Sequence, residues 1–406
     1  MKYQILHKSP KIVSKGSIIL FISAVLALIL DNTSWCVYYE TLFNSPLSVQ
    51  LGALQLSRSL LFWINSGLMT VYFLLIGLEI KREILYGKLK SFSKVFLPVI
   101  AGLGGILVPI IIYIAFNWKN TLSLRGWAIP TATDIAFSLG MLSLAGNRLP
   151  INLKIFLTTL AVFDDIGSIF IIAIFYTHHF SLIFLLSAGC FLGLLILLNR
   201  LHVTMTTIYI LVGIILWICV LESGIHATLV GIIVAFTIPV CNRKDRQVSS
   251  LHNLERVLQP WVTFGVLPIF AFANSGISLT RIGLESLFSP ITLGIALGLF
   301  LGKQIGICLA YSLGIKAVSW IQPISLFHKK DNIDWRFLYG TSVIAGMGFT
   351  MSLLISTIAF GDIGQSYSSM ARLGVIIGSS LSGIFGYLIL SLSSYREYSS
   401  FKKLES

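Results

Sequence analysis

Four ionisable side chains lie inside long apolar runs of this sequence. Asp164 and Asp165 are neighbours in one run, and Asp134 and Lys303 each lie in another. An ionisable group in the middle of a membrane-spanning helix costs about 2.5–3.5 kcal/mol, so a charge that persists there indicates a functional site. For a single buried aspartate, a packing or salt-bridge role is an equally good interpretation. Four such charges in one chain favour a shared polar site.

The aspartate pair has the chemistry to bind a cation and protons in turn. Adjacent positions on a helix point about 100° apart, so one carboxylate can face Lys303 while the other faces an aqueous funnel. Two carboxylates close together in a poorly solvated site do not both ionise easily. Their oxygens suit a hard cation such as Na+ and also accept protons, so each ligand excludes the other. The pair predicts cation/proton exchange; the alternative is an inert buried network with Lys303.

Two of the apolar runs contain residues that interrupt helices. Pro130 and Thr133 precede Asp134 in one run, and Gly346 and Gly348 lie in the middle of another. Interrupted spans expose backbone carbonyls and helix ends, and paired broken helices often mark an ion site. We expect Asp134 to balance the charges of the helix ends where the two runs cross, with Thr133 supplying an oxygen. Close helix packing is the alternative role for the two glycines.

The composition predicts an all-α integral membrane protein. Hydrophobic residues make up 56% of the 406 residues and charged residues only 11%, against about 45–50% and 25% in soluble proteins. About twelve windows have the roughly 20 apolar residues that a membrane-spanning helix needs. Their approximate limits are 17–31, 58–79, 95–117, 126–145, 152–177, 180–199, 203–221, 223–240, 259–279, 288–315, 337–359 and 370–393. We expect one transmembrane transporter domain, 1–406, with short tails.

Lysines and arginines are concentrated in alternate gaps between the predicted spans. Twenty-three lie on one side and five on the other, with Lys303 inside a span. Because cytoplasmic loops collect basic residues, both termini are predicted to be cytoplasmic. The net charge of +13 is therefore an orientation signal, and no nucleic-acid partner is expected. The five cysteines show no metal-ligand or disulfide spacing, so they are interpreted as packing residues, and no cofactor is predicted.

The gap from Asp31 to Ser57 is the longest predicted external connection. Its segment Trp35–Glu40 is aromatic and β-branched. This pattern predicts a short external β-hairpin at these residues. An interfacial aromatic anchor is the alternative.

Together with their neighbours, these residues resemble the NhaA family of bacterial sodium/proton antiporters. The segments that carry the resemblance are Ile64–Met69, Gly77–Glu83, Gly126–Phe137, Lys154–Tyr176, Ser223–Thr228, Pro268–Gly276, Gly302–Lys303 and Gly346–Ser352. The resemblance implies an inverted-repeat transporter fold whose discontinuous fourth and eleventh spans cross near the midplane. It implies a secondary transporter, not an enzyme, in the bacterial inner membrane. It also implies a homodimer that uses the external hairpin.

The activity that the resemblance implies is electrogenic exchange of cytoplasmic Na+ or Li+ for external protons by alternating access, which serves pH and sodium homeostasis. Asp164 and Asp165 would bind the ion, and Lys303 would pair with Asp164 when sodium is absent. Asp134 and Thr133 correspond to the family's residues at the crossing of the broken helices. These assignments come from the resemblance and not from the spacing of the residues.

The resemblance also implies a pH-sensing surface on the cytoplasmic side. Its residues would be Glu79, Arg82, Glu83 and Glu255. Familiar members of the family carry histidines where Arg256 and Gln259 stand, and an aspartate where Ser66 stands. Arginine and glutamine do not titrate near neutral pH as histidine does. We therefore expect an altered or weaker pH response.

Three other function classes compete with exchange as interpretations of the sequence. Asp-Asp can begin the aspartate-rich motif of membrane prenyltransferases, but no third carboxylate follows Asp165, and no second such motif or arginine cluster is present. A sodium channel usually has rings of carboxylates or carbonyls along an open pore. A buried Lys303 beside the acids argues against a channel. A sodium-coupled symporter needs a larger substrate cavity, and the sequence leaves that alternative open.

Overall fold

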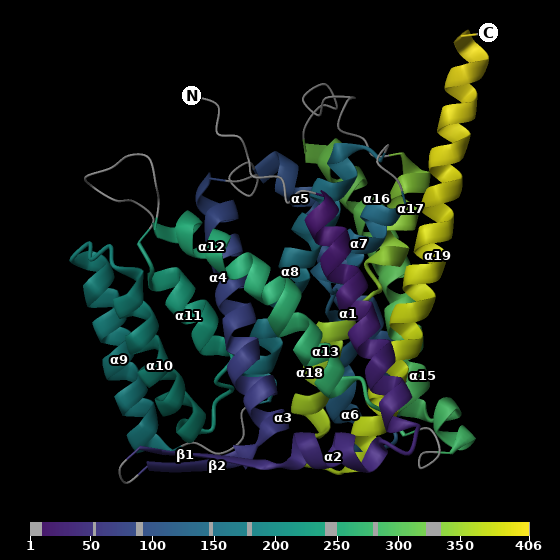
Figure 1. The fold of residues 1–406 in the computed structure, drawn as a ribbon. Helices are drawn as coiled ribbons and strands as arrows, with labels where there is room; N and C mark the ends of the chain where they lie inside the picture. Colours follow the sequence, from purple (N-terminus) through teal and green to yellow (C-terminus); the bar gives the residue numbers. More distant parts are fainter. Residues whose placement is uncertain are drawn as a thin grey trace. The chain divides into compact units, whose positions relative to one another are not determined.

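The protein is almost entirely helical in a computed structural model that describes residues 10–51, 54–86, 92–145, 149–176, 181–239, 250–278, 283–321 and 334–405 (Figure 1). Helices suit these apolar runs because a helix satisfies its own backbone hydrogen bonds where no water is present. The elements before residue 180 are α1 (Pro10–Asp31), α2 (Cys36–Asn44), β1 (Pro46–Leu51), β2 (Leu54–Ser59), α3 (Leu60–Trp63), η1 (Ile64–Leu68), α4 (Met69–Tyr86), α5 (Phe92–Asn117), α6 (Thr121–Leu124), η3 (Arg125–Thr131), α7 (Ile135–Leu144) and α8 (Ile151–Phe175).

The elements after residue 180 are α9 (Leu182–Arg200), α10 (Thr206–Ser223), α11 (Leu229–Thr237), α12 (Ser250–Trp261), η4 (Val262–Val266), α13 (Leu267–Asn274), η5 (Leu284–Phe288), α15 (Pro290–Leu297), η6 (Gly298–Gly302), α16 (Lys303–Ile321), α17 (Trp335–Ile344), α18 (Phe349–Phe360) and α19 (Gln365–Glu405). Three short segments among all these elements, η1, η4 and η6, are single turns of π-helix inside longer helices. Such turns are frequent at functional sites.

Within the described residues, eight helices are long and apolar enough to cross a membrane. Two further pairs of helices pass the same test together but are bent, by 112° between α1 and α2 and by 41° between α17 and α18, which raises the number to ten. The predicted run 126–145 is divided between the 3-10 segment η3 and the short helix α7, and the run 223–240 contains the short helix α11. The protein is therefore an all-α membrane protein, and the number of twelve spans stays a prediction.

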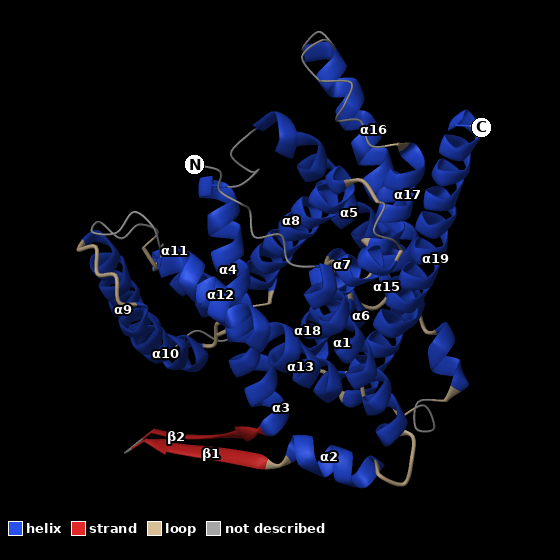
Figure 2. Ribbon diagram, turned by 45° about the horizontal axis from the view of Figure 1, so that its top comes forward, coloured by secondary structure: helices blue, strands red, loops and turns tan. Residues whose placement is uncertain are grey.

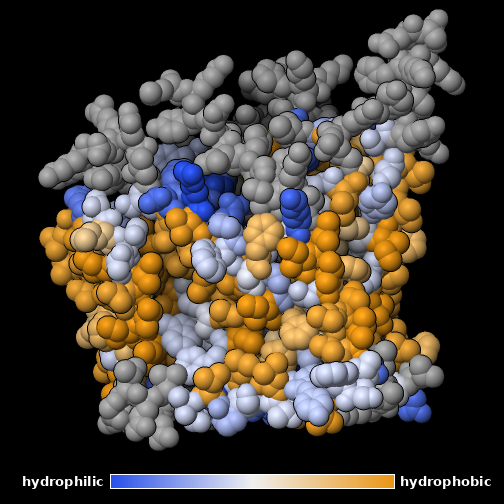
Figure 3. All heavy atoms as spheres, in the orientation of Figure 1, coloured by the Kyte–Doolittle hydropathy of each residue, from blue (hydrophilic) through white to orange (hydrophobic). Residues whose placement is uncertain are grey.

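Large apolar side chains cover the outward faces of these helices (Figure 3). Ile183 on α9 is 78% exposed and Phe170 on α8 is 62% exposed. A soluble monomer rarely exposes apolar patches of this extent. The exposed faces indicate contact with lipid.

The chain divides into two compact units, each built from separated segments. The first unit comprises Met1–Ile22, Ser91–Ser168 and Ile277–Ser406, and the second comprises Ser23–Lys90 and Ile169–Gly276. In the second unit, α4, α9, α10 and α11 enclose a core that includes Leu78, Tyr209 and Val234.

In the first unit, α5 and α16 cross at two glycines. A Cβ on Gly104 would collide with the carbonyl oxygen of Gly306, and a Cβ on Gly306 would collide with that of Gly104. Small residues of this kind let helix backbones approach closely in a membrane. The close crossing holds Lys303, at the start of α16, against α5, where a Cβ on Gly105 would lie 3.6 Å from Lys303 Cδ.

The predicted hairpin is present in the connection after the first helix, but at other residues. Strands β1 and β2 pair antiparallel from Pro46 opposite Ser59 to Leu51 opposite Leu54 (Figure 2). The segment Trp35–Glu40, where the hairpin was predicted, instead enters helix α2. The reason is a tertiary contact, because Tyr39 packs against Phe272 and its hydroxyl donates to the Phe272 carbonyl at 2.5 Å.

Candidate functional site

Both predicted interruptions are present in the first unit, and they bond to each other. Helix η3 ends at Thr131 and α7 begins at Ile135, while α17 ends at Ile344 and α18 begins at Phe349. Between the two breaks, the backbone N–H of Asp134 donates to the Met347 carbonyl at 2.6 Å. The Ser352 hydroxyl donates to the carbonyl of Ile129 at 2.7 Å. The interrupted segments therefore meet at a hydrogen-bonded crossing.

Asp134 lies at this crossing and caps two helices. Its Oδ1 accepts the backbone N–H of Phe137 at 3.0 Å, in the first turn of α7. Its Oδ2 accepts the backbone N–H of Thr350 at 3.0 Å and the Thr350 hydroxyl at 2.5 Å, in the first turn of α18. A carboxylate at a helix N-terminus is stabilised by the unpaired N–H groups and by the helix dipole. Asp134 therefore bonds to the N-terminal turns of both α7 and α18.

Asp164, on α8, forms a fully buried ion pair with Lys303. Lys303 Nζ lies 2.5 Å from Asp164 Oδ2 and both side chains are 0% exposed. The Thr133 hydroxyl lies 2.7 Å from the same carboxylate oxygen. The other oxygen, Oδ1, accepts no hydrogen bond from the described residues and faces α5, 3.4 Å from where a Cβ on Gly102 would stand. Glycine at that position leaves room for the carboxylate.

Asp165 is the next residue on α8 and is also 0% exposed. Neighbouring helix positions point about 100° apart, so its carboxylate leaves the helix in a different direction from that of Asp164. The structure thus brings Asp164, Lys303 and Thr133 into direct contact. It places Asp134 at the adjoining crossing.

Lys303 and Thr133 each have a second acceptor on the broken helices. Lys303 Nζ lies 2.5 Å from the Thr131 carbonyl, at the end of η3. The Thr133 hydroxyl lies 2.7 Å from the carbonyl of Ala345, the residue that directly follows α17. Sequence reasoning missed both backbone contacts, because carbonyls carry no signature in the sequence.

The residues of the predicted pH-sensing surface gather in the second unit. Arg82, on α4, bonds to Glu255 on α12, and its Nη2 lies 3.1 Å from Glu83 Oε1. Glu79, one turn earlier on α4, interacts electrostatically with Arg82. Glu255 is 5% exposed and Glu79 is 9% exposed, so this network is largely buried.

Lys81 has a structural role that the sequence did not indicate. Lys81 is a charged residue near the end of α4, yet its side chain is only 9% exposed. Its Nζ donates to the carbonyls of Phe236 at 2.6 Å and Ile238 at 2.5 Å, at the C-terminal end of α11. A cation at a helix C-terminus satisfies carbonyls that lack partners within the helix and is favoured by the helix dipole. Lys81 therefore joins α4 to the end of α11.

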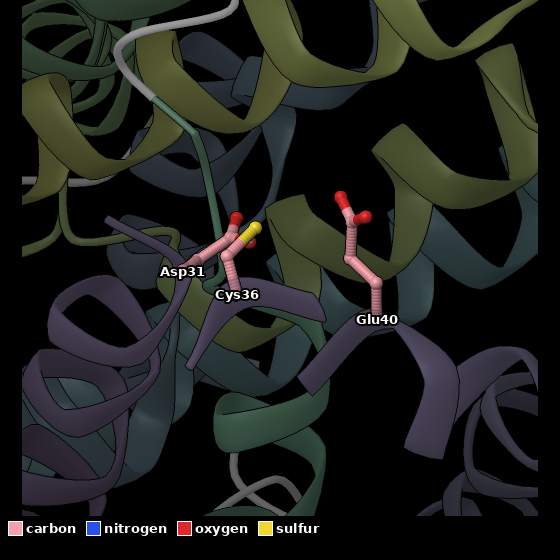
Figure 4. A group of neighbouring side chains, drawn as sticks. All are labelled: Asp31, Cys36 and Glu40. Atoms are coloured by element: carbon pink, nitrogen blue, oxygen red, sulfur yellow. Dashed lines mark hydrogen bonds between the residues drawn. The ribbon is translucent and has the colours of Figure 1, made fainter. Parts of the chain in front are cut away.

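Asp31, Cys36 and Glu40 form a separate cluster in the second unit (Figure 4). One potential ligand atom from each lies within 4.8 Å of the others. The Cys36 thiol donates to Asp31 Oδ1 at 3.2 Å, so this cysteine is more than the packing residue that the sequence suggested.

Comparison with known proteins gives one consistent family. The model of the family described as Na+/H+ antiporter 1 matches residues 9–390. The chain is 48% identical over 384 residues to Na(+)/H(+) antiporter NhaA 2 of Magnetococcus marinus, which covers 93% of this chain and 95% of the relative. It is 47% identical over 377 residues to the NhaA of Psychrobacter arcticus, covering 93% and 92%. It is 48% identical over 385 residues to the NhaA of Rhodospirillum rubrum, covering 93% and 94%.

Proposed function

The chain belongs to the Na+/H+ antiporter 1 family, and on this premise we propose that it exchanges sodium ions for protons across the bacterial inner membrane. The observation that supports this function best is the buried Asp164 carboxylate, with Asp165 beside it on α8. Carboxylate oxygens in a dry site bind either a hard cation or protons. Competition between the two ligands couples the export of sodium to the entry of protons.

Lys303 is the third participant in this exchange. Its ammonium neutralises Asp164 while no cation is bound. An ionised carboxylate in a poorly solvated site is stable only when it is paired, so an entering cation takes the place of the ammonium. Asp134 holds the crossing together through its two helix caps. The proposal also includes an electrogenic stoichiometry, alternating access and transport of Li+. It further includes cytoplasmic termini and a homodimer joined through the β1–β2 hairpin.

Transport in everted membrane vesicles tests the proposed function. After respiration has acidified the vesicle interior, adding sodium chloride is expected to dissipate the proton gradient, which a pH-sensitive dye reports. Choline chloride at the same concentration and vesicles without the protein are the controls. Absence of a sodium response above both controls would exclude sodium/proton exchange.

We further propose that the network of Glu79, Arg82, Glu83 and Glu255 influences the pH response. Arg256 and Gln259 lie on α12, as Glu255 does, and neither is a histidine. The joint replacement Arg256→His with Gln259→His is expected to steepen the pH dependence of exchange, because histidine changes charge in this range. The pH profile of transport measures this, and Arg256→Lys with Gln259→Asn is the matched control. An unchanged profile in the histidine variant contradicts the proposal.

A further inference from the structure

Thr133 and Lys303, the two donors to Asp164 Oδ2, each lie within hydrogen-bond distance of a backbone carbonyl as well. The Thr133 hydroxyl carries one proton but lies 2.7 Å from both Asp164 Oδ2 and the Ala345 carbonyl. It makes a full hydrogen bond to only one of them at a time. Lys303 Nζ lies 2.5 Å from both Asp164 Oδ2 and the Thr131 carbonyl. Both donors therefore have an acceptor that is not a carboxylate.

The two carbonyls are available because the helix breaks redirect their usual donors. In a continuing 3-10 turn, the Thr131 carbonyl would accept from the N–H of Asp134. That N–H donates instead to the Met347 carbonyl at 2.6 Å. In a continuing α-helix, the Ala345 carbonyl would accept from the N–H of Phe349. That N–H donates instead to Ser379 Oγ at 3.2 Å.

We propose that the carbonyls of Thr131 and Ala345 are reserve acceptors that keep Lys303 and Thr133 hydrogen-bonded while a cation occupies Asp164. The inference rests on the proposed function and gives the broken helices a further role, which is to supply these two acceptors. A cation at Asp164 Oδ2 displaces both donors from that oxygen. A buried donor that loses its partner costs its full desolvation penalty, and a charged donor costs more. With the reserve acceptors in place, the cation enters without leaving either donor unpaired.

The same arrangement frees the oxygen of Thr133 for the cation. When its proton points to Ala345, the lone pairs of the hydroxyl turn away from that carbonyl and become available as ligands. Sodium binding is thereby coupled to a stronger hydrogen bond at the end of α17. Thr133 acts here as a positioning residue for the crossing as well as an oxygen donor.

A double-variant cycle with a backbone ester tests the proposal. Glycolate in place of Gly346, introduced by nonsense suppression, turns the carbonyl of Ala345 into an ester carbonyl, which is a weaker acceptor. Equilibrium binding of radioactive sodium to the purified full-length protein is measured with and without Thr133→Val. The ester is expected to weaken sodium binding by about threefold to tenfold when Thr133 is present, the size of one lost hydrogen bond. It is expected to change nothing in the Thr133→Val background.

The cycle separates this effect from general damage. The ester also removes the N–H of Gly346, which donates to the Val343 carbonyl at 3.0 Å, but that loss occurs in both backgrounds and cancels. Glycolate in place of Gly361, whose N–H donates to the Thr357 carbonyl at 2.9 Å, is the matched control at the end of α18. An equal loss of affinity in both backgrounds, or none in either, overturns the proposal.

Infrared spectroscopy supplies a second measurement that does not depend on the affinity of Thr133→Val. With an isotope-labelled carbonyl at Ala345, saturating sodium is expected to lower the stretching frequency of that carbonyl, because its hydrogen bond strengthens. A frequency that does not move with sodium overturns the proposal even if exchange itself is normal. Failure of the unmodified protein to bind sodium at all would instead count against the proposed function.

Discussion

Asp164→Asn is expected to abolish sodium/proton exchange, lowering the sodium-dependent proton flux by more than about a hundredfold. The variant loses an anionic ligand and leaves the buried ammonium of Lys303 without its partner. Removing one member of a buried ion pair costs about 3–5 kcal/mol, which corresponds to about two to nearly four orders of magnitude in an equilibrium. Asp165→Asn is expected to have a similar effect on flux, because the pair no longer holds two exchangeable charges. The flux is measured in proteoliposomes.

Controls separate lost transport from lost folding. Asp362→Asn changes an exposed carboxylate in the turn after α18 and is expected to leave exchange unchanged. Asp164→Asn with Lys303→Met removes both charges, so it is expected to regain thermal stability relative to Asp164→Asn while exchange stays absent. Exchange at the original rate in Asp164→Asn or Asp165→Asn would remove that residue from the ion site.

Asp134→Ala is expected to give the largest loss of stability among single changes at the crossing. The carboxylate accepts three hydrogen bonds at the first turns of α7 and α18, and it is fully buried. Loss of an N-cap costs about 0.5–2 kcal/mol. Two caps lost together therefore predict a decrease of about 1–4 kcal/mol in the free energy of unfolding. Thermal unfolding of the purified protein in detergent measures it as a lower midpoint.

Two variants test whether this effect comes from the caps. Asp134→Asn keeps a side-chain oxygen, so it is expected to lose about half as much free energy of unfolding as Asp134→Ala. Thr350→Val removes only the hydroxyl donor at 2.5 Å and is also expected to cost less than Asp134→Ala. Asp362→Ala is the matched surface control. A midpoint for Asp134→Ala equal to that of the control would show that the helix caps do not stabilise the crossing.

The sequence predicted the chemical content of the site better than its contacts. Asp134, Asp164, Asp165 and Lys303 stand out as isolated charges in apolar runs. Burying an ionisable group costs free energy, so such a residue indicates a functional role. Proline and glycine predicted both helix breaks, because these residue types interrupt a helix at the place where they occur. The sequence did not predict that η6 forms a π-turn before Lys303, where the turn packs against α5 and α19.

What the sequence by itself determined is therefore the class of protein, the positions of the breaks and the four buried charges of the candidate site, all of which follow from local composition. Only the tertiary structure decided that Asp164 contacts Lys303 directly, because adjacent positions on one helix differ in direction and the neighbouring helices select one of them. It alone decided that Lys81 caps α11 and that Tyr39 holds Trp35–Glu40 in a helical segment. These contacts join residues far apart in the chain, and hydrogen bonds to backbone carbonyls depend on position rather than on residue type.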